Sequence, residues 1–452
     1  MASQNVHICL KTKTKTLVLI ALICGLISVP FGFAQTFENT PEWISSLNSQ
    51  DNWFSDVAIS SDGNYIAALG ENPGQLLFYT KESNASVWSH SLPLSPIDLS
   101  MTPDGAYIVA GYLNGYESLS YVAVFANNQS SPLWTYQFPS GFDVTRVAIS
   151  NDGKTIAAAI NHLTGSYTLQ TKVLLFNTSD FNSPSETDFS GILTSLTMSS
   201  DGNYLAVSTS HYSNEGEGKI YLLSSIERKI LWEYSIGLDA DCSVISGDGK
   251  YLIASGFSSR YSAQLVYFFS TQSSTPIWTS EIDSVHPGVR PKISISENGS
   301  RAVISGWYTP AILFSTSYRD YLNYTFKRTG GDCNAISRDG SYAVTAGPFN
   351  KITIFKWTGA AFEIAWSATL NEDILVDDVG LSSNGRYLVA GTDHGGLILY
   401  DNTKARQVSS QFENPWFWAI VLAVGATVAG ASALVIRKQF KKNKSAIALK
   451  KV

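Results

Sequence analysis

The chain has few of the residues on which many enzymes and disulfide-stapled domains depend. Its 452 residues include only four cysteines and six histidines. It contains no His-Glu-x-x-His, no Gly-x-Ser-x-Gly, no phosphate-binding glycine loop and no paired-cysteine zinc pattern. These absences argue against the common metalloprotease, serine hydrolase, nucleotide-binding and zinc-site classes. Four cysteines are also too few for a dense disulfide framework, whereas a hydrophobic content of 44% is ample for packed sheets.

The N-terminal end predicts a targeting segment. Residues 1–15 hold three lysines and no acidic residue, and 16–34 is an uncharged apolar run that ends in Gly-Phe-Ala. A basic start, an apolar run and a small-x-small exit predict a secretory signal peptide over 1–34, cleaved after Ala34. An uncleaved membrane anchor is the alternative, because the apolar run is nearly long enough to span a bilayer.

The C-terminal end predicts a membrane anchor. Residues 416–436 form a run of 21 residues without a charge, against the roughly 20 that a helix needs to cross a bilayer. Two tryptophans begin this run, where an aromatic belt would lie, and a lysine- and arginine-rich tail follows it. We therefore expect a juxtamembrane segment and transmembrane helix over 413–436, a basic cytoplasmic tail over 437–452, and an extracellular domain over 35–412. The expected location is the cell membrane, with a single pass.

The charge of the expected extracellular part excludes one class of partner. Three of the 31 Lys and Arg residues lie in 1–34 and seven lie in 416–452, while neither segment holds any of the 37 acidic residues. The rest of the chain thus carries 21 cations against 37 anions, a net charge of −16. Such a surface repels phosphate backbones, so nucleic acid is a poor candidate partner. The basic tail suits anionic lipid instead.

A six-residue turn motif recurs through the middle of the chain and numbers its repeats from first to eighth. The copies read SSDGNY (60–65), TPDGAY (102–107), SNDGKT (150–155), SSDGNY (199–204), SGDGKY (246–251), SENGSR (296–301), SRDGSY (337–342) and SSNGRY (382–387). The spacing between successive glycines is 41 to 50 residues. A period of this length is typical of a four-stranded propeller blade.

Each repeat is predicted to form strands separated by turn residues at recurring positions. A short apolar strand precedes the turn, and Asp-Gly suits the tight hairpin into a second strand. A third strand follows, and a tryptophan then marks the outer fourth strand; these are Trp88, Trp134, Trp232, Trp278 and Trp366. Phe189 and Tyr324 are the expected substitutes in two repeats. We interpret this row as packing between blades, because a repeated position is rarely a single functional site.

The strand count predicts how the ring closes. Residues 41–47 read as a tryptophan-type fourth strand with no first three strands, while the last repeat lacks its fourth. The N-terminal segment would therefore complete the last blade and remove the open sheet edges. The alternative fourth strand is 407–412, whose pattern is weaker. We expect an all-β, eight-bladed β-propeller closed by an N-terminal strand; seven blades with one degenerate repeat is the alternative.

These residues resemble the WD-repeat and YVTN-type β-propellers, and the tryptophan-bearing outer strands resemble those of quinoprotein propellers. The S-x-D-G-x-Y turn and the apolar strand after it carry the resemblance over 41–402. The resemblance implies the fold and leaves the function open, since such propellers include scaffolds, adhesins, sensors and some enzymes. The Trp-Asp dipeptide is missing. No adjacent cysteine pair or obvious calcium cluster is present, so a quinone cofactor is not carried over and none is predicted.

The position seven residues before each turn glycine, called the inner column below, is the first candidate site. The positions on either side hold similar residues from repeat to repeat, whereas the residue at this position varies. In chain order it is Asp56, Asp98, Arg146, Ser195, Cys242, Lys292, Cys333 and Asp378. The preceding position adds Asp241, Asp332 and Asp377. These side chains should lie near one mouth of the central channel and bind a ligand there. The alternative is that they cap strand ends and hydrate the channel.

Calcium is the candidate cation, held among Asp241, Asp332, Asp377 and Asp378. Two blades separate Cys242 from Cys333, so we expect free thiols.

Aromatic side chains in loops on the same face form the second candidate site. The candidate residues are Trp53, Tyr112, Tyr212 and Trp307. Exposed aromatics beside carboxylates suit recognition of carbohydrate or peptide better than catalysis. The alternative is that each packs its own loop.

Asn-x-Ser/Thr sequences predict glycosylation at Asn84, Asn128, Asn177 and Asn323. Together these features predict a membrane-tethered extracellular propeller that binds proteins or glycans as a scaffold at the cell surface. The alternative is an exported enzyme, dependent on quinone or a cation, with its site at the channel mouth.

Overall fold

The computed structural model describes a β-propeller built almost entirely of antiparallel strands. It describes residues 36–408, apart from 48–51, 94, 115–118, 165–167, 212–216, 238, 259–262, 283–290, 307–308, 317–332, 348–349 and 372–373. Phe37–Arg406 forms one compact unit. The described residues contain no α-helix, only the single 3-10 turn Asn402–Lys404.

The first three repeats each form a four-stranded sheet whose strands follow chain order. The first repeat contributes β3 (Phe54–Ile59), β4 (Tyr65–Gly70), β5 (Gln75–Thr80) and β6 (Trp88–Ser91). The second contributes β7 (Ser95–Met101), β8 (Tyr107–Asn114), β9 (Leu119–Ala126) and β10 (Trp134–Gln137). The third contributes β11 (Phe142–Ile149), β12 (Thr155–Thr164), β13 (Thr168–Asn177) and β14 (Asp180–Ser190).

The fourth and fifth repeats are linked into one eight-stranded sheet by a single bridge between Ser210 and Asp239. The fourth contributes β15 (Ile192–Met198), β16 (Tyr204–Ser210), β17 (Gly218–Ser224) and β18 (Lys229–Gly237). The fifth contributes β19 (Asp239–Ile245), β20 (Tyr251–Ser258), β21 (Ala263–Ser270) and β22 (Trp278–Ile282).

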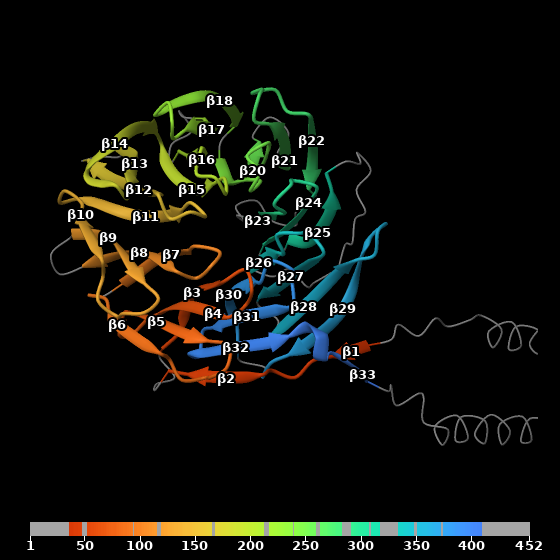
Figure 1. Cartoon of the computed structure of the whole chain (residues 1–452). Helices are drawn as coiled ribbons and strands as arrows, with labels where there is room; N and C mark the ends of the chain where they lie inside the picture. The colour runs from red at the N-terminus through yellow and green to blue at the C-terminus, as the bar shows by residue number, and fades with distance from the viewer. Residues whose placement is uncertain are drawn as a thin grey trace, which may run out of the picture. The chain divides into compact units, whose positions relative to one another are not determined.

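The last three repeats complete the ring. The sixth contributes three described strands, β23 (Lys292–Ile295), β24 (Arg301–Gly306) and β25 (Thr309–Ser315). The seventh contributes β26 (Cys333–Ile336), β27 (Tyr342–Gly347), β28 (Lys351–Trp357) and β29 (Phe362–Thr369). The eighth contributes β30 (Val376–Leu381), β31 (Tyr387–Thr392) and β32 (Gly396–Asp401). Figure 1 shows the sheets arranged around a centre, with the labelled first strands β3, β7, β11, β15, β23, β26 and β30 toward the middle.

The N-terminal strand completes the sheet of the eighth repeat, as the strand count predicted. Strand β2 (Trp43–Ser46) pairs antiparallel with β32, with Trp43 opposite Leu399 and Ile44 opposite Ile398. Of the alternative segment 407–412, the described part belongs to β33 (Arg406–Val408), which pairs with β1 (Thr36–Glu38) instead. The last sheet therefore has no open position beside β32.

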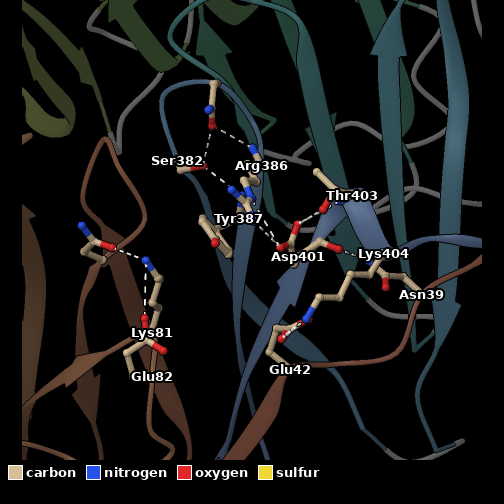
Figure 2. A network of polar contacts seen from close by, with 12 residues as sticks. Asn39, Glu42, Lys81, Glu82, Ser382, Arg386, Tyr387, Asp401, Thr403 and Lys404 are labelled. Atoms are coloured by element: carbon tan, nitrogen blue, oxygen red, sulfur yellow. Dashed lines mark hydrogen bonds and ion pairs between the residues drawn. The ribbon is translucent and has the colours of Figure 1, made fainter.

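Polar contacts reinforce this junction (Figure 2). The Asn39 side chain donates a 2.9 Å hydrogen bond to the Asp401 carbonyl, and Lys404 lies 2.6 Å from the Glu42 carboxylate. Arg386 lies 3.0 Å from the Asp401 carboxylate. Burial opposes the charge of Asp401, but hydrogen bonds from Arg386 and Thr403 outweigh it and hold the pKa of this carboxyl below its ordinary value.

The recurring turn motif folds the same way in each repeat. The Ser60 hydroxyl donates to the Asp62 carboxylate at 2.6 Å and accepts from the Tyr65 amide at 3.0 Å, and other repeats show the same two bonds. Gly63 has a φ of 77°, in the left-handed region that glycine adopts without strain. The turn therefore satisfies its own polar groups while its first serine is fully buried.

Each turn also packs on the preceding repeat, which explains why glycine and tyrosine recur together. A Cβ atom at Gly63 would lie 2.2 Å from the ring of Tyr387, and one at Gly105 would lie 2.7 Å from the ring of Tyr65. The tyrosine of the eighth repeat thus packs on the glycine of the first. The Ser383 amide likewise donates to the Ser61 carbonyl at 2.9 Å. The turns close the ring with the same contacts that join other neighbouring repeats.

The outer tryptophans pack between repeats, as predicted. The indole N–H of Trp88 donates to the Asn127 carbonyl of the next repeat at 2.8 Å, and that of Trp232 donates to the Thr271 carbonyl at 2.8 Å. Trp43 makes the equivalent bond to the Lys81 carbonyl at 2.9 Å across the closure.

The structure describes only one of the two residues predicted to replace the outer tryptophan. Phe189 lies on the fourth strand of its repeat and packs edge-on against Tyr221 of the next repeat. However, Ser185, opposite Leu175, occupies the register position of the tryptophans. Tyr324 lies outside the described residues.

Several sequence predictions fall outside the described residues. They are the signal peptide 1–34, all of the juxtamembrane and transmembrane segment with its tail 413–452, and glycosylation at Asn323. Within the part of the chain that the structure describes, no helix is long and apolar enough to cross a bilayer.

Candidate functional site

A β-bulge sets the direction of the inner-column side chains. The pairing of first and second strands shifts by one residue immediately before this column, for example between Phe54 and Asp56 and between Val376 and Asp378. Four other repeats show the same shift. A bulge inserts an unpaired residue and re-aims its neighbours. Here it directs the column residue toward the first strand of the following repeat.

Three inner-column carboxylates accept backbone amides of that following strand. Asp378 accepts from the Val57 N–H at 3.1 Å, Asp56 accepts from the Leu99 N–H at 2.7 Å, and Asp98 accepts from the Val147 N–H at 2.6 Å. They link the eighth, first, second and third repeats in succession. These carboxylates therefore bond to amides inside the first strand of the neighbouring repeat, rather than to amides at its ends.

Other members of the column make the same link with different chemistry. The Ser195 hydroxyl accepts from the Ser243 N–H at 2.7 Å, and the Cys242 sulfur accepts from the Ile293 N–H. Burial raises the pKa of Cys242 to about 11, which keeps it a thiol at neutral pH. Cys333 is buried and donates to the Ala346 carbonyl at 3.3 Å. Cys242 and Cys333 are not joined by a disulfide, as predicted.

The acidic members crowd one another. The Asp98 and Asp378 side chains are 19% and 18% exposed, low enough for desolvation to matter. Burial raises the pKa of Asp98 to about 6, although the Arg146 guanidinium, 4.0 Å away, opposes this rise. Burial and the neighbouring carboxylates of Asp378 and Asp98 raise the pKa of Asp56 well above its ordinary value. The Lys292 ammonium lies 3.6 Å from the Asp378 carboxylate.

The candidate calcium site gains no support from the described residues. Asp241 is buried and accepts a 2.7 Å hydrogen bond from the Gln264 side chain. Asp377 is the bulge residue of β30, and Asp332 lies outside the described residues. Among the residues that the structure describes, no three acidic, histidine or cysteine side chains are grouped so that they could hold a metal ion.

The predicted aromatic site is only partly described. Tyr112 is not an exposed loop residue, and that expectation is wrong, because β8 continues through it to Asn114. Its ring is buried and stacks on Tyr121 with 5.2 Å between centroids, and burial raises its pKa to about 12. Trp53 is half-buried just before β3, while Tyr212 and Trp307 lie outside the described residues.

Three predicted glycosylation sites are sterically accessible. Asn84, Asn128 and Asn177 are exposed, and each lies at or just beyond the end of a third strand. Glycans at these positions would lie on the same side as the turn motifs, because both connections follow strands running in that direction.

Two features that explain the inner column could not be predicted from the sequence. The bulge has no signature in one sequence, and the acceptor of each side chain is a backbone amide of the next repeat. The available signal was the recurrence of Asp at equivalent places in consecutive repeats, at Asp378, Asp56 and Asp98, which favours a repeated structural contact.

Comparison with known proteins supports the fold. No family model matches the chain, and no curated protein matches it. Among solved structures, the chain is similar to the β-propeller domain of Cps50 (Swd1) from Myceliophteria thermophila, with a TM-score of 0.52 and 12% sequence identity. The match covers 80% of this chain and 99% of that one. At this identity the likeness shows a WD-repeat-like β-propeller fold alone.

Proposed function

We propose that this chain is an eight-bladed propeller, anchored by 413–436 and displayed outside the cell, that serves as a scaffold for binding other proteins. The observation that carries the proposal is the use of inner-column carboxylates as links between repeats. Asp378, Asp56 and Asp98 each accept an amide of the neighbouring strand, so their position serves the ring. Recognition is then left to the loops at that end of the strands.

The charge and the fold support a binding module over an enzyme. The net charge of −16 outside the two end segments favours encounter with cationic partner surfaces. Propellers present many loops on a rigid ring, which is the arrangement that binding surfaces use. Glycan binding is the other ligand class that the loop aromatics suggest, and the exposed Asn84 and Asn128 fit an exported domain.

Site-specific photocrosslinking in the full chain tests the binding face. A photoreactive residue at exposed His394, in the loop between β31 and β32, should form protein adducts on intact cells. The same residue at exposed Lys356, at the turn-motif end of β28 in the seventh repeat, is the matched control. Adducts at neither position, or only at Lys356, would overturn the proposed face. Retention on a glycan array without protein adducts would assign a glycan ligand instead.

Tag accessibility tests the proposed topology separately. An epitope inserted after His394 should be labelled on unpermeabilised cells, whereas an epitope after Val452 should be labelled only after permeabilisation. The reverse pattern would contradict the extracellular assignment.

A further inference from the structure

A pocket of about 360 Å³ lies between the third and fourth repeats, at the end of the strands that carries the turn motifs. Thr155 and Ser185 line it from the third repeat, and Asn203, Ser225, Ile226 and Arg228 line it from the fourth. Its volume falls within the range of small-ligand sites. It lies at the opposite strand ends from the loops proposed above to bind protein, so the two sites are independent.

The pocket exists because the third repeat lacks its tryptophan. In other repeats the fourth-strand tryptophan pairs with one register position of the third strand, as Trp88 does with Phe78 and Trp232 does with Leu222. The equivalent pair in the third repeat is Leu175 with Ser185. A hydroxymethyl group therefore lies where other repeats place an indole.

The connection before this strand also leaves the pocket open. Asn177 pairs directly with Asp180, so only two residues join β13 to β14, whereas seven residues separate β5 from β6. The short hairpin places Phe181 against Trp134 of the second repeat, with 4.3 Å between ring centroids. Asn177, Ser179 and Asp180 of this hairpin form one wall of the pocket, while Phe181 packs on the second repeat.

The fourth repeat offers the acceptor that an indole uses elsewhere in the ring. The carbonyls that accept from Trp43, Trp88 and Trp232 belong to Lys81, Asn127 and Thr271. Each of these residues directly follows the third-strand residue that pairs with the motif tyrosine. In the fourth repeat that residue is Ser225, which lines the pocket. The third repeat supplies no tryptophan to this carbonyl.

An exposed apolar side chain at the pocket rim suggests a covering partner. Ile226 is 71% exposed, more than any other exposed large hydrophobic residue that the structure describes. The equivalent position in other repeats holds polar residues, such as Glu82, Asn128 and Gln272. Arg228 also lines the pocket, and a guanidinium can stack on an aromatic ring.

We propose that this pocket, the indole slot, binds the tryptophan side chain of a partner polypeptide. The ring of the partner would fill the space beside Ser185 and donate its N–H to the Ser225 carbonyl. A polypeptide is favoured over a free aromatic molecule because β14 is the last strand of its sheet. Its outer edge can pair with the backbone on either side of the tryptophan.

The test measures binding of N-acetyl-Gly-Trp-Gly-amide to the purified full chain by calorimetry and NMR. Ser185→Trp, which supplies the missing ring, should raise the melting temperature and weaken peptide binding at least tenfold. Ser89→Trp, on the fourth strand of the first repeat, is the control and should leave binding unchanged. The same peptide with 1-methyltryptophan should bind about fivefold more weakly, as expected for one lost hydrogen bond.

Each remaining outcome decides the proposal. No peptide binding to the wild-type chain, or equal binding by wild type and Ser185→Trp, would overturn it. If Ser185→Trp does not fold, Ile226→Gln, which copies the fifth repeat, should weaken binding about fivefold, and unchanged binding would count against the slot. Free indole binding as tightly as the peptide would overturn the assignment to a polypeptide.

Discussion

Gly63→Ala should destabilise the propeller by about 2–5 kcal/mol, from two separate causes. The φ of 77° is unfavourable for alanine, and the added Cβ would lie 2.2 Å from the Tyr387 ring. That ring belongs to the eighth repeat, so the clash falls on the junction that closes the ring. Urea denaturation followed by circular dichroism would measure the loss of stability.

Gly359→Ala separates the two causes. Gly359 has a φ of 97°, and a Cβ there would meet no atom within 4 Å, so only backbone strain should remain, about 1–2 kcal/mol. The Gly63→Ala effect should also shrink in a Tyr387→Ala background, because the clash is removed. Equal losses at Gly63 and Gly359, with no coupling to Tyr387, would contradict packing between repeats at this turn.

Asp98→Asn should stabilise the protein at pH 8 and leave it unchanged near pH 4. Asparagine can keep an oxygen acceptor for the Val147 N–H while removing the charge. The pKa of Asp98 is raised from 3.8 to about 6, so its protonated form is favoured in the folded state. The stability that this preference contributes is present below about pH 4 and is lost as the pH rises through about 6. The difference at pH 8 amounts to about 3 kcal/mol.

The measurement is the free energy of unfolding of both proteins across pH 4 to 8, with exposed Asp143→Asn on β11 as the control. Asp143→Asn should change stability by less than about 0.5 kcal/mol at every pH. If Asp98→Asn is less stable than wild type, and by the same amount at pH 4 and pH 8, the result would contradict the account. The carboxylate would then be required in its charged form, paired with Arg146.

Features that repeat in the sequence were the predictable ones. The turn motif, the outer tryptophans and the pairing of 41–47 with the last repeat follow from counting strands and matching equivalent positions. They are predictable because the same short-range chemistry, such as Ser60 with Asp62 and Tyr65, recurs in each copy. Recurrence separates a structural requirement from chance in a single sequence.

Features that depend on departures from the repeat were harder to predict. Phe189 was matched to the tryptophan row by its place in the strand, but the two-residue hairpin before β14 moves the register so that Ser185 takes that place. Tyr112 was assigned to a loop because β-strand length is not encoded in the motif. The inner column is defined by its spacing from the turn glycine, but its bulge and its backbone partners on the neighbouring repeat arise only in three dimensions.

A disulfide across β2 and β32 tests the ring closure most directly. Ile44 and Ile398 lie directly opposite each other, so Ile44→Cys with Ile398→Cys should form a bond within one chain under mild oxidation. Ser46→Cys with Ile398→Cys is two residues out of register and should not. Peptide mapping by mass spectrometry under non-reducing conditions should find the 44–398 link in the monomer, with a raised melting temperature. A bond that forms only between chains, or equally well in the shifted pair, would contradict closure of the propeller by its N-terminal strand.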